Sequence, residues 1–344
     1  MPTPPPVKRF ETPSGIRVYR IGCRVMPEMS GRVYLVLEAG PPTLVDAGSG
    51  CIESNADIVA AFETIRHEFD EMVHLEDVRR ILITHAHFDH IGGLSFFVDR
   101  QKVEVGLHPL ERSILLAQEE RQVLRSQGWE RLRRRIGAEE LPKSQFFNIR
   151  PPLPQHRPLE ITIDMEDQTT LDGLTFLHTP GHASGHVCIV ADGLLLCGDH
   201  LLSRTIPQLW PESTRPYLGM GHFLDSLKQL RRTPGLTVGL AGHERVIENV
   251  YRRIDDIFTA QDRRNNRLLE TLTNADHPMT VAELTRSIYA VGVGRYATLA
   301  LMDIAARSEY LHYRGVLRIA NLAEVATDEN VAWRYEIAPN QKIT

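Results

Sequence analysis

The stretch Thr84–His90 reads THAHFDH, and it constrains the fold of this chain more than any other segment. Its ionisable side chains are His85, His87, Asp89 and His90. An apolar run over 81–83 precedes the stretch and a glycine pair follows it, which predicts a strand that ends in a loop opening into a helix. Because imidazole and carboxylate groups are common ligands of divalent metals, the pattern indicates a metal site at a strand end.

The composition is that of an ordinary globular protein of 344 residues, a length that suggests about two domains. The formal net charge of −5 provides no general attraction to nucleic acid or to an anionic membrane, and no apolar stretch is long enough to span a bilayer. The cysteines form no Cys-x-x-Cys pair, so we interpret them as mostly buried free thiols and expect a reducing, cytoplasmic location.

Strand-like segments occur both in meanders and separated by helices, which predicts two packed sheets with helices outside, an α/β class. The expected strands are 16–26, 31–38, 42–46, 81–84, 103–107, 160–165, 173–178, 186–190, 193–197 and 236–241, and the expected helices are 53–69, 109–135 and 221–232.

The pattern changes after residue 244. A long polar helix is expected over 245–273, and Thr280 with Glu283 three residues later predicts the start of a second helix that reaches about residue 289. A third helix over 297–311 and a strand pair, 316–319 and 332–337, around an Asp-Glu-Asn turn complete the order of a winged-helix domain.

These patterns predict three parts. Residues 1–15 are expected to be a disordered or extended lead-in, residues 16–250 a catalytic domain, and residues 251–344 a helical, winged-helix-like domain. A helical insertion over 108–158 is expected near the active site.

Polar residues follow four further strand-like segments, where a rigid sheet commonly holds ligands. They are Asp46, His182, Asp199 and His243. With these motifs in place, the chain resembles the metallo-β-lactamase-fold hydrolase superfamily over roughly residues 15–250, since all five superfamily motifs occur in order. The resemblance implies a four-layer αβ/βα sandwich with the metal site at one edge.

The resemblance also implies a role for each motif residue. His85, His87 and His182 would hold one cation, and Asp89, His90 and His243 a second. Asp199 would bridge the two, with a water or hydroxide as the nucleophile, while Asp46 would orient a ligand. Asp89 would in addition pass a proton to the leaving group. Zinc is the expected metal for both positions, with iron or manganese as alternatives.

Differences between this sequence and particular branches of the superfamily reduce the number of activities to be expected. The best-known β-lactamases have cysteine where Asp199 stands, and the gap between Asp199 and His243 is too short for the large inserted domain of the superfamily's nucleic-acid-processing enzymes. The chain is more similar to glyoxalase II-like thioesterases and to a branch with a C-terminal winged helix, which includes single-strand-specific endoribonucleases.

Five side chains outside the motifs are expected to bind substrate: Arg131, Arg134, Tyr217, Arg263 and Arg267. The arginines would hold an anionic group. The alternative for those between 108 and 158 is a solvated helix face paired with glutamates.

The expected function is therefore a dinuclear metal-dependent hydrolase of an ester or thioester, such as an acyl-CoA or glutathione thioester. The alternative is a phosphodiesterase that cleaves single-stranded RNA, although the chain from Tyr251 onward carries twelve basic and twelve acidic residues and is neutral. A non-catalytic metal-binding regulator is a third hypothesis. A homodimer is compatible with all three.

Overall fold

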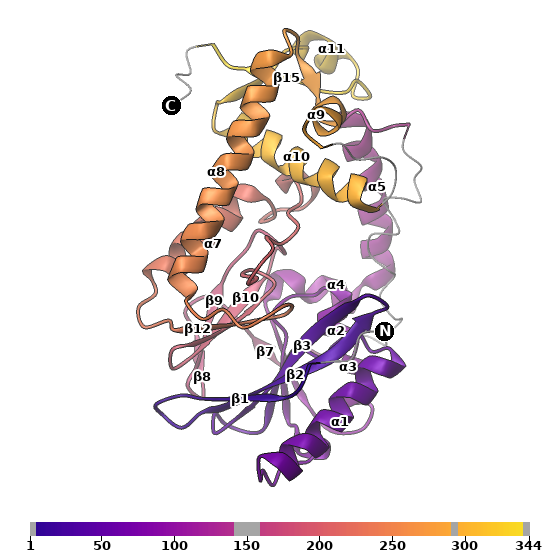
Figure 1. The fold of residues 1–344 in the computed structure, drawn as a ribbon. Helices are drawn as coiled ribbons and strands as arrows, with labels where there is room; N and C mark the ends of the chain where they lie inside the picture. The colour runs from indigo at the N-terminus through magenta and orange to yellow at the C-terminus, as the bar shows by residue number, and fades with distance from the viewer. Residues whose placement is uncertain (1–4, 141–158, 290–294, 340–344) are drawn as a thin grey trace. The chain divides into compact units, whose positions relative to one another are not determined.

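The computed structural model describes residues 5–140, 159–289 and 295–339, drawn as a ribbon in Figure 1. It divides into two compact units. Unit 1 comprises the described parts of Met1–Gln118, Pro152–Pro207 and Ser226–Ile254, and unit 2 those of Glu119–Pro151, Gln208–Asp225 and Asp255–Thr344. Within the described ranges, no helix is both long and apolar enough to cross a membrane.

The first sheet of unit 1 has seven strands in chain order. They are β1 (Lys8–Glu11), β2 (Arg17–Met26), β3 (Met29–Leu37), β4 (Thr43–Val45), β5 (Arg80–Leu82), β6 (Glu104–Leu107) and β7 (Ile163–Asp164). Pairing is antiparallel from β1 to β4 and parallel from β4 to β7. The carboxyl ends of β4 and β5 therefore lie at the same edge of the sheet.

The second sheet has five strands in the order β12-β11-β10-β9-β8. They are β8 (Thr170–Leu171), β9 (Leu174–His178), β10 (Val187–Ala191), β11 (Leu194–Gly198) and β12 (Val238–Ala241). Only β11 and β12 are parallel, which brings their carboxyl ends together. The amide of Val187 donates to the carbonyl of Thr84 at 2.8 Å, so the start of β10 is joined to the end of the β5 segment.

Apolar side chains of the two sheets share one core. Val18, Tyr34 and Leu82 of the first sheet cluster with Phe176 and Ile189 of the second. The opposite face of the first sheet is covered by α1 (Ile52–Glu68), the helix labelled beside that sheet in Figure 1. Its Ile58, Phe62 and Ile65 are buried. The predicted α/β sandwich is confirmed.

Further helices of both units follow α1 along the chain. In chain order they are η1 (Leu75–Asp77), α2 (Phe88–Ile91), α3 (Leu94–Val98), η2 (Pro109–Glu111), α4 (Arg112–Leu116), α5 (Gln118–Arg135), η3 (Glu212–Thr214), α7 (Met220–Arg232), α8 (Val250–Asn274), α9 (Val281–Ile288), α10 (Arg295–Tyr313) and α11 (Leu322–Thr327).

Unit 2 contains a small antiparallel sheet in the order β13-β15-β14, with β13 (Met279–Thr280), β14 (Leu317–Ile319) and β15 (Arg334–Ile337). The predicted start of α9 is confirmed, because Thr280 and Glu283 form a reciprocal capping box. The unit's core includes Leu132 of α5 and Ile136, which follows that helix, beside residues of α8, α9 and α10. The identification of this unit as a winged helix stays a prediction.

Several segments differ from the expectation. Residues 8–11 of the expected lead-in form strand β1. Helix α8 begins at Val250 instead of residue 245, because Ile247 forms a backbone bridge with Gly239. Helix α11 lies between the last two strands, ahead of the predicted turn. The expected insertion over 108–158 is divided between the units, and its part from 141 to 158 lies outside the described residues.

Candidate metal centre

Seven side chains of unit 1 converge at the carboxyl ends of strands from both sheets. His85 and His87 follow β5, Asp89 and His90 lie in α2, His182 lies between β9 and β10, Asp199 follows β11 and His243 follows β12. They form two groups, His85–His87–His182–Asp199 and Asp89–His90–His243, and within each group the ligand atoms lie within 4.8 Å of one another. The superfamily resemblance implied the same two histidine-containing groups with Asp199 shared between them, and cation binding by these residues stays a prediction.

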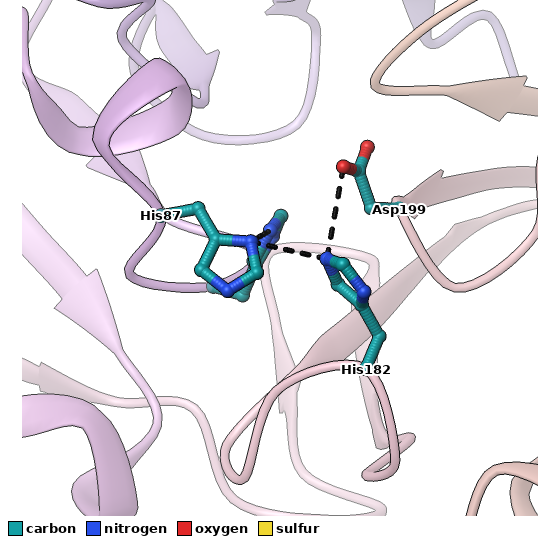
Figure 2. Close-up of side chains that lie close together, drawn as sticks. His87, His182 and Asp199 are labelled. Atoms are coloured by element: carbon teal, nitrogen blue, oxygen red, sulfur yellow. Dashed lines mark hydrogen bonds and ion pairs between the residues drawn. The ribbon is translucent and has the colours of Figure 1, made fainter. Parts of the chain in front are cut away.

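In the first group, imidazole nitrogens face one another. His87 Nδ1 lies 2.9 Å from His85 Nε2 and 3.0 Å from His182 Nε2. His182 Nε2 also lies 3.7 Å from Asp199 Oδ2, and Figure 2 shows His87 and Asp199 both turned toward the ring of His182. A ring nitrogen carries at most one proton, so hydrogen bonds alone satisfy this arrangement poorly, whereas a cation would satisfy all these lone pairs.

In the second group, Asp199 again takes part. His243 Nε2 lies 3.2 Å from Asp89 Oδ2 and 3.4 Å from Asp199 Oδ2. His90 Nε2 lies 3.6 Å from Asp199 Oδ1, and both of these atoms are buried without a hydrogen-bond partner among the described residues. Buried polar atoms rarely lack a partner, so the residues present fit a bound cation.

Asp46 organises two of the histidines from behind. It is buried, and it accepts hydrogen bonds from the Thr84 amide at 2.8 Å and from His90 Nδ1 at 2.7 Å. The Thr84 hydroxyl also donates to Asp46, so its oxygen is left to accept from His85 Nδ1 at 3.1 Å. With a cation bound, both rings would keep their proton on Nδ1 and present an unprotonated Nε2 to the site.

Other polar groups fix the remaining ligands. His243 Nδ1 donates to the carbonyl of Ser30 at 2.9 Å. His186 Nε2 accepts from the Asp199 amide at 3.1 Å, so His186 lies behind this carboxylate. His178 Nε2 donates to the carbonyl of Ser184 at 2.9 Å, in the loop that carries His182.

His108 and His200 stand outside both ligand groups. His108 caps the short helix η2, since its Nδ1 accepts from the amide of Leu110 at 3.2 Å, and its ring stacks on that of His178 at 4.0 Å. Burial, together with the neighbouring His178, lowers the pKa of His108 to about 4. Burial and nearby His182 lower the pKa of His200 to about 3.

In the absence of a cation, the cluster balances its own charges. Burial opposes ionisation of Asp199, but His243 and His90 hold the pKa of its carboxyl well below the usual range. Burial likewise disfavours protonated His243, but Asp199 and Asp89 raise its pKa to about 10. Burial and the surrounding histidines keep the pKa of His85 well below its ordinary value. Protons on His90 and His243 thus occupy positions where a cation would compete with them.

The five residues expected to bind substrate all belong to unit 2, whereas the metal-ligand candidates belong to unit 1. Arg131 and Arg263 are exposed. Arg134 contacts Asn330 and Glu130, Arg267 donates to the carbonyl of Ile288, and the ring of Tyr217 lies 5.4 Å from that of His222. Substrate contact by these side chains stays a prediction.

Sequence patterns did not reveal three supporting residues. Thr84 lies inside the motif, but the pattern assigned its hydroxyl no role. Glu111 is buried and accepts from the amide of Gly185 at 2.9 Å, which fixes the loop of His182. Glu244 directly follows His243, but its residue type by itself predicted no function. Only Thr84 and Glu244 had a usable signal, namely their position next to ligand candidates.

Comparisons with known proteins agree with this geometry. The model of the metallo-beta-lactamase superfamily matches residues 26–243. The probable metallo-hydrolase YqjP of Bacillus subtilis is 24% identical over 81% of this chain and 86% of its own length. A hydroxyacylglutathione hydrolase of Idiomarina loihiensis is 24% identical over 51% of this chain. The chain spans about half the length of that relative, 51%.

Two solved structures resemble most of this chain in fold. A metallo-beta-lactamase family protein from Thermus thermophilus has a TM-score of 0.71 and 26% identity, covering 93% of this chain and 98% of that one. A beta-lactamase domain protein from Burkholderia ambifaria also has a TM-score of 0.71, with 20% identity, covering 96% of this chain and 94% of that one. At this lower identity the likeness bears on the fold alone.

Proposed function

This chain belongs to the metallo-beta-lactamase superfamily, and we propose that it is a dinuclear metal-dependent hydrolase of an ester or thioester. The first cation would be held by His85, His87 and His182, and the second by Asp89, His90 and His243. Asp199 would serve both, because its Oδ2 lies 3.7 Å from His182 Nε2 of the first group and 3.4 Å from His243 Nε2 of the second. When bound, two such cations would lower the pKa of a water and polarise the scissile carbonyl. Zinc is the metal we propose, with iron or manganese as alternatives.

The observation that carries the proposal is the pair of buried, unpartnered atoms His90 Nε2 and Asp199 Oδ1 among the described residues. Leaving such atoms without a partner costs about 1–3 kcal/mol each. Natural proteins keep this cost where function uses the atoms, and a buried imidazole nitrogen and a carboxylate oxygen that face each other in a histidine-rich site fit cation binding.

Two carboxylates would have separate roles in the proposed reaction. Asp46 has no place in either ligand group, and it would keep the rings of His85 and His90 in the tautomer that ligation needs. Asp89 accepts from His243 Nε2 at 3.2 Å in the absence of a cation. In the proposed reaction Asp89 would help to hold the second cation and would pass a proton to the leaving group.

The proposed substrate class comes from the relatives. Proteins named hydroxyacylglutathione hydrolase match parts of this chain, including a 73-residue stretch at 38% identity in the protein of Xanthomonas euvesicatoria pv. vesicatoria. We therefore place a glutathione or coenzyme A thioester first among the substrates to be tested.

The test is a parallel assay of the purified, metal-loaded protein on glutathione thioesters, acyl-CoA and single-stranded RNA. The His87→Ala variant removes one ligand, and His67→Ala, whose imidazole is largely exposed on α1, is the matched control. Thioester cleavage that is lost in His87→Ala and kept in His67→Ala supports the proposal. Cleavage of RNA alone would replace it with the phosphodiesterase alternative, and bound metal without turnover on any substrate would refute a hydrolase.

A further inference from the structure

The carboxylate of Glu244 binds the loop that follows Asp199. Glu244 comes directly after His243, is half-buried, and has a φ of 65°, a left-handed conformation that is uncommon for a residue with a side chain. Its oxygens accept from Ser203 Oγ at 3.1 Å, from the Arg204 amide at 2.6 Å, and from the amide and hydroxyl of Thr205 at 3.2 and 2.7 Å. One side chain thus closes the loop onto the His243 turn.

The first sheet holds the same turn from the other side. The Arg32 guanidinium, which is buried, donates to the carbonyl of Glu244 at 3.1 Å. Two residues earlier in β3, the carbonyl of Ser30 accepts from His243 Nδ1. The Ser30 carbonyl therefore orients the ring of His243, and the Arg32 guanidinium separately holds the backbone of the next residue, Glu244.

The loop also has an independent anchor. Arg253 donates to the carbonyls of Leu202 and Thr205, both at 2.6 Å. Since Arg253 holds the carbonyls and Glu244 holds the N–H and hydroxyl groups, removing Glu244 would loosen the loop without releasing it entirely. A defect in a Glu244 variant would then be local.

We infer that Glu244 is a positioning residue that keeps the His243 turn and the Asp199 loop at the spacing which the second cation requires. The inference rests on the proposed dinuclear function. The two ligand candidates face each other at 3.4 Å, between His243 Nε2 and Asp199 Oδ2, and the carboxylate of Glu244 is a direct hydrogen-bonded link between the segments that carry them. Changing groups that orient ligands commonly weakens metal binding about 10- to 100-fold.

The substitution Glu244→Gln separates charge from shape. An amide of the same length offers one oxygen in place of two, and its N–H groups would face the donors of Arg204 and Thr205. Glu244→Gly also removes the carboxylate, but it favours the left-handed backbone, so it separates loss of the side chain from backbone strain. Glu248→Gln is the matched control, because Glu248 is exposed four positions later.

The experiment titrates metal-free full-length variants with Zn²⁺ against a chelator and follows hydrogen exchange of the Arg204 and Thr205 amides. We expect Glu244→Gln and Glu244→Gly to bind the second ion about 10- to 100-fold more weakly, to exchange both amides faster, and to regain turnover in excess Zn²⁺. The control should match the wild type in each respect.

Two results would contradict different claims. If wild type binds two ions and Glu244→Gln binds both with unchanged affinity, the positioning role is wrong while the proposed function stands. If wild type binds fewer than two ions, the dinuclear function is wrong and the role assigned to Glu244 fails with it. Faster amide exchange with unchanged metal affinity would also overturn the inference, since it would reduce Glu244 to a structural support.

Discussion

A methyl group added at Gly242 would enter the space beside two ligand candidates. The Cβ of an alanine there would lie 2.5 Å from Asp199 Oδ1 and 2.7 Å from His90 Cε1. Gly242 does not use a left-handed backbone, so alanine introduces a steric change rather than a conformational one. The substitution therefore tests whether the exact placement of these two side chains matters for metal binding.

The size of the effect follows from these distances. An ordinary contact begins at 3.4 Å, so the carboxylate oxygen must move by 0.9 Å and the imidazole carbon by 0.7 Å. Metal–ligand distances tolerate only about 0.2 Å. We expect the affinity for the second cation to fall at least about 100-fold, or roughly 2.7 kcal/mol. Overpacking should also destabilise the metal-free protein by about 1–3 kcal/mol.

The assay is a chelator competition with Zn²⁺ on wild type, Gly242→Ala and Gly128→Ala, with thermal unfolding of each metal-free protein. Gly128 has no atom within 4 Å of an added Cβ, so its variant should bind metal normally and gain a little helix stability. If Gly242→Ala binds two ions as tightly as wild type, Asp199 and His90 are not ligands in the proposed geometry.

Three further predictions concern other parts of the chain. Asp46→Asn should weaken binding of the second cation about 10- to 100-fold, because an amide N–H facing His90 Nδ1 would favour the tautomer protonated on Nε2. An unchanged affinity measured by calorimetry would contradict this. Zn²⁺ uptake at pH 8 should release protons and tighten as pH rises toward 10, because His243, with a pKa raised to about 10, holds a proton that the ion must displace; equal heats in buffers of different ionisation enthalpy would argue against it. Glu283→Ala should cost about 1 kcal/mol in chemical denaturation, since it breaks the reciprocal cap with Thr280, and a variant as stable as wild type would refute the role of that cap.

Local patterns carried the strongest predictions. His85, His87, Asp89 and His90 are close in sequence, so the strand–loop–helix that presents them was readable from the chain alone. The grouping with His182, Asp199 and His243 needed the superfamily resemblance. Which strand ends meet is decided by pairing such as Val187 with Thr84, and spacing along the chain does not contain that information.

The misses have physical reasons. The helix expected over 109–135 was expected to belong to an insertion near the active site, but helical periodicity does not say which core receives Leu132, and this residue packs in unit 2. Residues 245–249 had a helical pattern, yet Ile247 pairs with Gly239, and this tertiary contact outweighs local propensity. The role of Glu244 could not be predicted, because its hydrogen-bond partners lie 39 to 41 residues away in the sequence.

The ligand candidates come from both sheets of unit 1, and this arrangement has a mechanical consequence. An ion bound by both His85 and His182 would form a reversible crosslink between the two sheets and would close a long loop of the chain. Each ion present at a hundred times its dissociation constant would add about 2.7 kcal/mol to the free energy of unfolding. The concentration of available metal would then set the stability of the folded protein as well as its activity.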